Sequence, residues 1–430
     1  MDAGLSSKVS PATAWRDQMR LIVGREHLRP ATGADSVCGV MPQFVVEPAT
    51  EQEVSKILAL ANEAGVAVIP RGAGSKLEWG NPPSRADLVL SMARLNRVIE
   101  HAWADMTVTV EAGCTFRKLQ DDLAKHGQRI ALDTLWPERA TLGGVLSTND
   151  SGALRLRFGS LRDLIIGITL ALPDGTVAHS GGKVVKNVAG YDLQKLATGA
   201  LGTLGVITRA IFRVHPLPQK SLTLSFKVTD AEQAQRVMLS IQSSKLAHTA
   251  LQARFAKDIA PVLDILFEGT TPGLVGQRTQ LDRLIAPLAA KEDSPAVWDM
   301  REHLSSADAA TSNFAITKIS VLPATTAATI ETIAHLANEH KLEWTAVTQA
   351  TGISWLRFIG EPREIFMALQ SLRVAVERDA GSLVLLRRPD GMLSFDAWGH
   401  AGDALPLMRA LKQRFDPRGT LNPARFVGGI

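Results

Sequence analysis

The most regular hydrophobic pattern in the chain lies between residues 48 and 75. Apolar side chains recur there at the spacing of one helical face, at Val54, Ile57, Leu58 and Ala61. Thr50 and Glu53 have the spacing of a capping box, and Gly65 is placed to end the helix. The apolar run Val66–Pro70 predicts a short strand, and a glycine-rich loop follows that strand directly.

Further apolar runs predict more strands and one more helix before residue 182. Strands are predicted over Ala86–Met92, Asn96–Ala102 and Met106–Gly113, and a helix over Thr115–Gly127. The segment Ile165–Gly181 predicts a strand pair, because its centre, Pro173-Asp174-Gly175, is a turn sequence.

The pattern changes after residue 218. Helices are predicted over Asp230–Ser244, Thr325–His340 and Glu361–Gly381, and strands over Ser221–Val228, Ile353–Gly360 and Ser382–Pro389. This succession predicts an α+β unit in which helices cover one face of an antiparallel sheet. The last segment, Leu411–Ile430, is rich in turn residues and arginine.

Composition and charge narrow the class of protein. The chain has 430 residues, 45% of them hydrophobic and 21% charged, which is typical of a soluble globular protein of two or three domains. Its net charge of +4 is small and no long basic run occurs, so nucleic acid is not expected as a partner. The longest apolar stretch, Leu164–Pro173, is too short to span a bilayer, and the N-terminus lacks the apolar region of a signal peptide. Cys38 and Cys114 form no CxxC pair, which fits a reducing compartment, and we expect a cytoplasmic protein.

The glycine-rich loop PRGAGSKLEWG, Pro70–Gly80, is a candidate phosphate-binding loop. It is not a P-loop, because position 77, five after Gly72, is Leu, and it is not a Rossmann fingerprint, because no helical pattern follows it. If it binds a phosphate, it does so through converging backbone N–H groups. Two further glycine-rich blocks follow, at Thr141–Ser160 and Lys186–Thr208.

Four motifs in this order resemble the flavoprotein family typified by vanillyl-alcohol oxidase and p-cresol methylhydroxylase. They are PRGAGSK, TLGG…TNDSG…FGSLRD, KNVAGYDLQKL..GALGTLGVIT and the tail RFDPRGTLNPARF. The resemblance implies a two-part FAD-binding domain of the PCMH type over residues 40–218, after an N-terminal extension over residues 1–39. It further implies an α+β cap domain with an antiparallel sheet over residues 219–400, and a tail, residues 401–430, that returns to the FAD domain.

The resemblance also assigns cofactor-binding residues. The first loop would wrap the FAD pyrophosphate, and the other blocks would line the flavin, the pyrophosphate or the adenine: Arg71, Gly72, Ala73, Gly74, Ser75, Lys76, Pro137, Thr141, Gly143, Gly144, Asn149, Gly152, Gly159, Gly205, Val206 and Ile207. Some family members carry a histidine bonded covalently to the flavin near Ser75, and serine cannot form that bond, so non-covalent FAD is expected. Ser151 stands where the family often has a glycine.

Several single residues leave alternatives open. Tyr191, the only tyrosine, is either a flavin contact or proton donor or, as we favour, a half-buried aromatic residue. Lys186 is either a phosphate partner or a surface charge. His335 and His340 are interpreted as ordinary histidines. Arg387, Arg388 and Arg425 could meet an anion, although surface arginines are commoner.

Within this family the chain is most similar to the smaller flavin subunits of glycolate oxidases. That implies a partner flavin subunit of the D-lactate dehydrogenase type and an iron–sulfur subunit, with any membrane contact made through partners. No HxGDGNxH-type metal motif is found, so no metal site and no catalytic residues are assigned. A self-sufficient FAD-dependent D-2-hydroxy-acid dehydrogenase, an enzyme of the UDP-N-acetylenolpyruvoylglucosamine reductase type and a structural subunit without flavin remain as alternatives.

Overall fold

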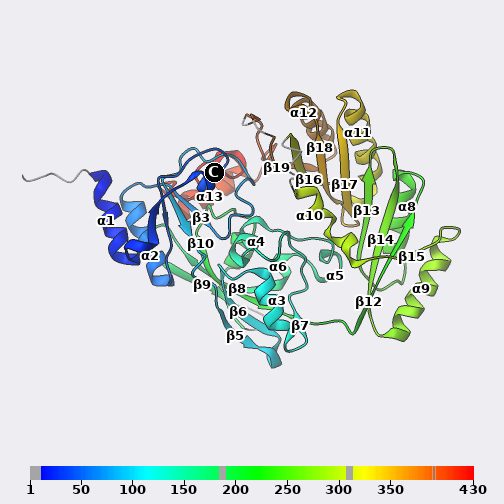
Figure 1. The fold of residues 1–430 in the computed structure, drawn as a ribbon, viewed down its shortest axis with the longest axis horizontal. Helices are drawn as coiled ribbons and strands as arrows, with labels where there is room; N and C mark the ends of the chain where they lie inside the picture. The colour runs from blue at the N-terminus through cyan, green and yellow to red at the C-terminus, as the bar shows by residue number, and fades with distance from the viewer. Residues whose placement is uncertain (1–10, 184–189, 307–312, 390, 393) are drawn as a thin grey trace, which may run out of the picture.

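The chain forms two units that lie side by side, with the C-terminal tail folded back onto the first of them (Figure 1). The computed structural model describes residues 11–183, 190–306, 313–389, 391–392 and 394–430. The first unit holds two sheets and the second holds a single larger sheet. The predicted α+β architecture is confirmed.

The first sheet has the strand order β1-β2-β4-β3. Its strands are β1 Leu28–Pro30, β2 Phe44–Val46, β3 Val68–Arg71 and β4 Leu88–Ser91. β4 pairs in parallel with β2 and β3, and β1 pairs antiparallel with β2. Helices α1 Pro11–Val23 and α2 Glu51–Glu63 share a hydrophobic core with this sheet. α1 and β1 therefore pack with this sheet, although they lie in the predicted N-terminal extension.

The helix expected after Pro48 forms as α2, and its apolar stripe is buried. Only half of the predicted capping box is present. The Thr50 side chain accepts a hydrogen bond from Glu53 N, but the Glu53 carboxylate accepts one from Ala49 N at 2.7 Å instead of from Thr50 N. Gly65 follows the helix with φ +65°, which a glycine adopts without strain.

The second sheet is antiparallel with the order β5-β6-β10-β8-β9. Its strands are β5 Val98–Ala102, β6 Thr107–Glu111, β8 Ile165–Ala171, β9 Val177–Gly181 and β10 Val206–Arg213. The helices of this part are α3 Phe116–Ala124, α4 Leu142–Thr148, α5 Arg155–Phe158, α6 Leu161–Leu164 and α7 Leu193–Ala197. A two-stranded pair, β7 Gln128–Arg129 with β11 His215–Pro216, lies where the chain leaves this unit.

The second unit, called the cap here, is built on an eight-stranded antiparallel sheet of order β15-β12-β14-β13-β17-β18-β16-β19. Its strands are β12 Lys220–Lys227, β13 His248–Ala256, β14 Ile259–Gly269, β15 Lys291–Glu292, β16 Phe314–Ser320, β17 Glu343–Gln349, β18 Ile353–Ile359 and β19 Ser382–Arg387. Its helices are α8 Ala231–Ser243, α9 Thr271–Ile285, α10 Met300–Ser305, α11 Thr326–Glu339 and α12 Pro362–Arg378. Short 3-10 helices complete the chain: Arg25–His27, Gly33–Asp35, Trp103–Asp105, Pro295–Asp299, Pro323–Thr325 and Val427–Gly429.

The two faces of the cap sheet have different neighbours. Helices α8, α9, α11 and α12 share the largest hydrophobic core with the strands. A separate, smaller core contains Leu304 of α10 and Trp355 of β18, and Trp79 of the first unit packs against it. This smaller core therefore joins the cap sheet to the glycine-rich loop of the first unit.

The C-terminal tail returns to the first sheet. After α13 Leu405–Phe415, Val68 N donates a hydrogen bond to Thr420 O at 2.8 Å, and Asn422 N donates one to Val68 O at 3.0 Å. Because β3 runs directly into the glycine-rich loop, these bonds place residues 420–425 beside that loop.

Candidate functional site

The glycine-rich loop leaves β3 with a row of unused hydrogen-bond donors. In the described part of the chain, the backbone N–H groups of Gly72 through Lys76 donate no hydrogen bond to other protein groups. Gly74 has φ +80°, a conformation in which successive N–H groups can turn toward a common point. Unused N–H groups are costly unless water or a ligand accepts from them, so the loop has the chemistry of an anion site.

The glycines of this loop are also required by close packing. A Cβ atom on Gly72 would lie 1.9 Å from Thr141 Oγ1, and one on Gly143 would lie 2.9 Å from the Cβ of Ala112. Thr141 precedes α4, and Gly143 and Gly144 lie in the first turn of that helix. The second glycine-rich block, which carried no helix prediction, thus folds as a short helix that meets the loop end-on.

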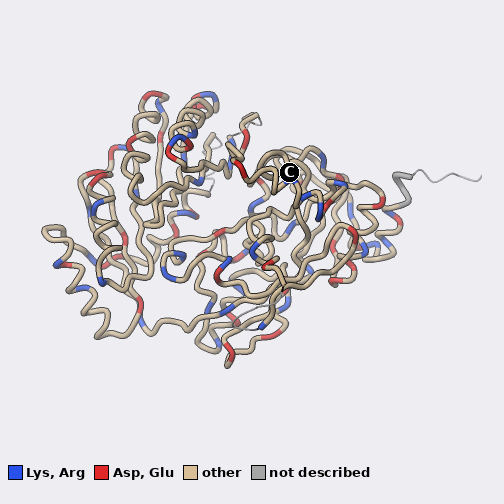
Figure 2. Tube along the Cα trace, turned by 180° about the vertical axis from the view of Figure 1, so that it is seen from behind, with Lys and Arg blue, Asp and Glu red and all other residues tan. Residues whose placement is uncertain are grey.

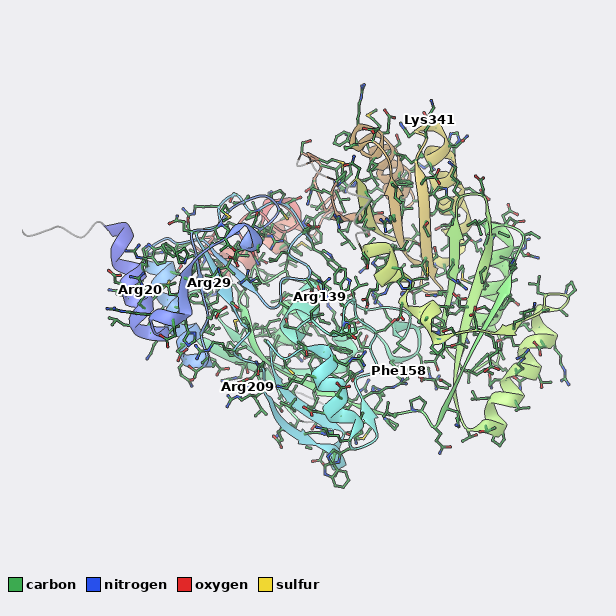
Figure 3. All side chains as sticks on the ribbon, viewed as in Figure 1. Arg20, Arg29, Arg139, Phe158, Arg209 and Lys341 are labelled. Atoms are coloured by element: carbon green, nitrogen blue, oxygen red, sulfur yellow. The ribbon has the colours of Figure 1, made fainter. Side chains whose placement is uncertain are left out.

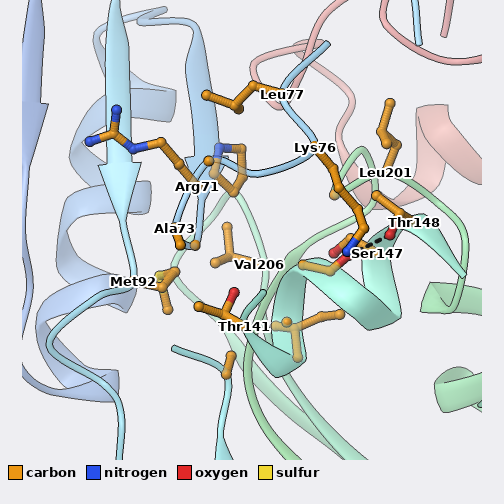
Figure 4. Close-up of a pocket in the computed structure, with 18 of the residues that line it drawn as sticks. Arg71, Ala73, Lys76, Leu77, Met92, Thr141, Ser147, Thr148, Leu201 and Val206 are labelled. Atoms are coloured by element: carbon orange, nitrogen blue, oxygen red, sulfur yellow. Dashed lines mark hydrogen bonds between the residues drawn. The ribbon is translucent and has the colours of Figure 1, made fainter. Parts of the chain in front are cut away.

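These segments line a cavity that is open to solvent (Figure 4). Its empty volume, including solvent at the opening, is about 730 Å³. It brings together most of the residues predicted from the sequence: Arg71, Gly72, Ala73, Gly74, Ser75, Lys76, Thr141, Gly143, Gly144, Gly205, Val206 and Ile207. Residues that the sequence did not single out as site residues complete the lining, among them Met92, Ser147, Thr148, Leu201, Gly202 and Asn422.

The cationic side chains of the loop are held by carboxylates. Arg71 Nη1 lies 2.7 Å from Asp35 Oδ1, and Figure 4 shows the Arg71 guanidinium directed away from the cavity. Lys76 Nζ lies 3.0 Å from Asp150 Oδ2, and both side chains are buried. An anion in this cavity would therefore meet backbone N–H groups, while the charges of Arg71 and Lys76 stabilise the loop itself.

Asp150 joins the loop to the cap. Its second oxygen, Oδ1, accepts a hydrogen bond from Arg301 Nη1 of α10 at 3.0 Å. Burial acts to raise the pKa of Asp150, but the charges of Lys76 and Arg301 and the hydrogen bonds from Thr134 and Leu135 outweigh it and hold the pKa well below its usual range. Asp150 is therefore an anion that ties the first unit to the cap.

Four predicted residues lie outside the lining of this cavity. Gly152 gives room to Asp133, since a Cβ there would lie 1.9 Å from Asp133 Oδ2. Gly159 has φ +83° directly before the capping box of α6. Asn149 ends α4 with φ 49°, and its buried Oδ1 has no partner among the described residues. Pro137 accepts a hydrogen bond from Arg117 N. The structure therefore does not bring these four residues into the lining of the first cavity.

The sequence left Arg425 open between an anion contact and the commoner surface position, and the structure excludes the surface position. The residue is only 2% exposed and lines the cavity. Its guanidinium donates to the backbone oxygens of Leu77 and Trp79, at 2.5 and 2.7 Å. Arg388 is also partly buried and donates to Gly80 O at 2.9 Å. Both arginines thus brace the end of the glycine-rich loop, which sequence patterns could not reveal because the partners are backbone oxygens.

Other candidates from the sequence lie elsewhere. Tyr191 is 89% exposed, so the expectation of a half-buried ring is wrong. His335 is exposed near Glu339, and His340 Nδ1 lies 2.8 Å from Glu364, so both are ordinary histidines as expected. Lys186 lies outside the described residues. Among the described residues no group of three or more potential metal ligands occurs.

A second cavity opens between the loop and the cap. Its empty volume, including solvent at the opening, is about 1020 Å³. The first unit contributes Trp79, Trp136 and Arg139, and the cap contributes Ile316, Leu386 and Arg387. Gly74, Ser75 and Leu77 line both cavities. Figure 3 places Arg139 between the two units.

Comparison with known families identifies the cofactor of the chain. Residues 42–181 match the family described as "FAD binding domain", and residues 399–426 match the one described as "FAD linked oxidases, C-terminal domain". The chain carries an FAD-binding domain. FAD is its cofactor, and the first match contains the glycine-rich loop and α4. The free N–H groups and the close-packed glycines of the loop fit a pyrophosphate.

Curated relatives agree with this over part of the chain. The glycolate oxidase subunit GlcD of Bacillus subtilis is 32% identical over 49% of this chain and 45% of its own length. The mitochondrial D-lactate dehydrogenase [cytochrome] of Arabidopsis thaliana is 36% identical over 42% of this chain and 32% of its own length. The chain thus spans less than half the length of these two relatives.

Solved structures extend the likeness of the fold to the cap. A p-cresol methylhydroxylase with bound substrate superposes with a TM-score of 0.77 over 98% of both chains, at 14% identity. An alkyldihydroxyacetonephosphate synthase superposes with a TM-score of 0.72 over 97% of this chain, at 18% identity. The FAD-binding domain and the cap therefore have the architecture of PCMH-type flavoproteins.

Charges of both signs are mixed over the molecule (Figure 2). Figure 2 shows Lys and Arg interspersed with Asp and Glu along the trace. Across the described ranges, every helix falls short of the length and apolar character needed to cross a bilayer.

Proposed function

We propose that this chain is the FAD-binding subunit of a 2-hydroxy-acid dehydrogenase of the glycolate oxidase type. The observation that carries the proposal is the row of unused N–H donors at Gly72 to Lys76 inside a cavity of the FAD-binding domain. The names of the relatives, a glycolate oxidase subunit and a D-lactate dehydrogenase, support the substrate class. When bound, FAD would supply this chain with electron-transfer chemistry inside the complex.

The residues of the chain have distinct tasks in this proposal. The N–H groups of Gly72 to Lys76 and the Ser75 hydroxyl hold the pyrophosphate, and Gly143 and Gly144 allow its close approach. Gly205, Val206 and Ile207 line the cavity at the start of β10, where they hold the adenine or the ring edge. Ser75 leaves the flavin non-covalently bound.

The partners complete the proposed complex. A second flavin subunit of the D-lactate dehydrogenase type oxidises glycolate, and an iron–sulfur subunit receives the electrons. The complex lies in the cytoplasm and reaches a membrane only through these partners. The tail over residues 401–430 closes the FAD domain of residues 40–218 behind the cofactor, and residues 219–400 form the cap.

A visible spectrum of the purified chain tests the proposal. A flavin spectrum that anaerobic glycolate leaves unchanged, and that bleaches when the partner subunits are added, is the expected result. Colourless but folded protein that takes up no added FAD would contradict the cofactor site.

A second candidate function is a dehydrogenase that acts without partners. The cavity that adjoins the glycine-rich loop and carries Arg139 and Arg387 favours it, because a 2-hydroxy acid needs cationic groups for its carboxylate. Bleaching of the flavin by a hydroxy acid in the isolated chain would distinguish this candidate from the first.

A further inference from the structure

The second cavity has the charge of an anion site. Neither the guanidinium of Arg139 nor that of Arg387 forms a hydrogen bond or an ion pair with any described residue. Arg387 Nε is buried without a partner, and its Cζ lies 3.9 Å from the centroid of the Phe314 ring. Arginines elsewhere around the loop are satisfied, as Arg71 is by Asp35. Two uncommitted guanidinium groups in one cavity match the planar, bidentate needs of a carboxylate.

Aromatic rings stand beside these charges. Trp79 and Trp136 both line the cavity, and Arg139 Cζ lies 5.0 Å from the centroid of the Trp136 ring. Trp136 has φ 52°, a strained conformation for a bulky residue. It persists because Arg139 N and Ala140 N donate to Trp136 O and the cap residue Glu302 accepts from Trp136 N. Backbone strain of this kind concentrates at functional sites.

The size of the cavity limits the ligand. Its volume of about 430 Å³ lies within the ~300–1000 Å³ range of pockets that hold drug-sized ligands. A two-carbon acid such as glycolate would fill only a small part of the cavity and would leave the indole and aliphatic side chains of the lining exposed to solvent.

We infer that this cavity binds an organic acid whose carboxylate lies on Arg139 and Arg387 and whose aromatic group packs against Trp79 and Trp136. The inference deepens the second candidate function, in which the chain acts without partners, and rests on it only for the 2-hydroxyl group of the substrate. Under that function, the substrate of this chain is an aromatic 2-hydroxy acid, larger than glycolate.

Calorimetric titration of the FAD-loaded chain with phenylacetate, which cannot be oxidised at a 2-hydroxyl, tests the cavity without any redox step. Phenylacetate should bind at least tenfold more tightly than acetate, because the ring adds apolar burial. R139Q and R387Q should each weaken it about tenfold, and R139K and R387K should recover part of the loss. E78Q removes a carboxylate from the same lining and should leave binding equal or tighter. Flavin content and circular dichroism verify that each variant is folded.

The outcomes separate the inference from the proposed function. Equal affinity for acetate and phenylacetate, or binding that both glutamine variants leave unchanged, would overturn the inference. The inference would also be overturned if phenylacetate binds the flavin-free protein and FAD abolishes that binding, because the cavity would then hold the cofactor. A third outcome is that phenylacetate binds but mandelate and glycolate both leave the flavin oxidised, even with the partners present. That outcome would support the inferred binding site and contradict the proposed function.

Discussion

The buried ion triad of Lys76, Asp150 and Arg301 provides the sharpest test of how the cofactor loop is held. Asp150 has a side-chain exposure of 0%, with Lys76 at 3.0 Å and Arg301 at 3.0 Å, themselves 4% and 5% exposed. The substitution Asp150→Asn removes the only charge in the triad that opposes the two cations. Breaking a buried pair by removing one partner costs about 3–5 kcal/mol, because the remaining charge stays desolvated. We expect a loss of that size in the free energy of unfolding of Asp150→Asn.

Asp122→Asn is the matched control, because Asp122 pairs with Lys125 on the surface at 2.6 Å. A surface pair contributes about 0–1 kcal/mol. Urea unfolding at pH 7, followed by circular dichroism, should therefore separate the two variants. The triple variant K76M/D150L/R301M, which removes all three charges together, should recover most of the stability. A loss for Asp150→Asn no larger than that for Asp122→Asn would refute the reasoning.

The pH dependence of the same variant follows from the low pKa of Asp150. A carboxyl whose pKa is lowered on folding contributes stability above its unfolded pKa, and that stability is lost as pH falls through the folded pKa. The folded pKa lies well below the usual carboxyl range. The difference in stability between the wild type and Asp150→Asn should therefore stay constant between pH 5 and pH 6.5, below the range in which Lys318 titrates. A difference that vanishes toward pH 5 would mean that Asp150 is not held as an anion.

Three further predictions concern the loop, the cap and their junction. Gly72→Ala brings a Cβ to 1.9 Å from Thr141 Oγ1, so FAD affinity measured by flavin fluorescence should fall more than tenfold, whereas Gly276→Ala, with nothing within 4 Å, should leave it unchanged. Unchanged FAD affinity in Gly72→Ala would show that the loop does not hold the cofactor. The pKa of Lys318 is lowered to about 8, because burial, together with the charges of Arg155 and Arg301, outweighs the opposing charge of Asp150. Between pH 8 and pH 10.5 the unfolded chain therefore binds one more proton than the folded chain at this lysine, so stability to urea should rise over that range. Lys318→Met should not show this rise. An equal rise in both proteins would assign it to another group. Glu268→Gln disrupts the pair in which Arg129 of β7 donates to Glu268 of β14 at 2.8 and 2.5 Å, so protease cleavage between the two units should become faster, while Glu343→Gln, from an exposed pair with Lys257, should match the wild type.

Local structure could be predicted well from the sequence where one face of an element is buried. α2 begins after Thr50 and buries the predicted stripe, and β8 and β9 turn at Pro173-Asp174-Gly175 as expected. Their periodicity and turn chemistry act within a few residues, so no distant contact is needed to specify them. The order of the glycine-rich motifs likewise indicated FAD, which the family matches support.

Elements without a clear period were missed. β13 and β14 form a long hairpin in the cap, yet neither was predicted, and no helix was predicted at α4, whose first turn carries Gly143 and Gly144. Glycine lowers helix propensity, and only the contact of α4 with the glycine-rich loop and with Ala112 explains why small residues stand there.

What the chain alone determined is therefore its local elements and the kind of ligand its loop can accept. The tertiary structure decided which charges are free to act. The sequence assigned Arg71 to the cofactor loop and left Arg387 and Arg425 open. Folding places Arg71 on Asp35, buries Arg425 among carbonyl oxygens and leaves the Arg387 guanidinium in a cavity, without a hydrogen-bond partner among the described residues. A side chain carries its charge wherever it lies, but only the fold determines whether a carboxylate or a carbonyl from a distant segment already neutralises it.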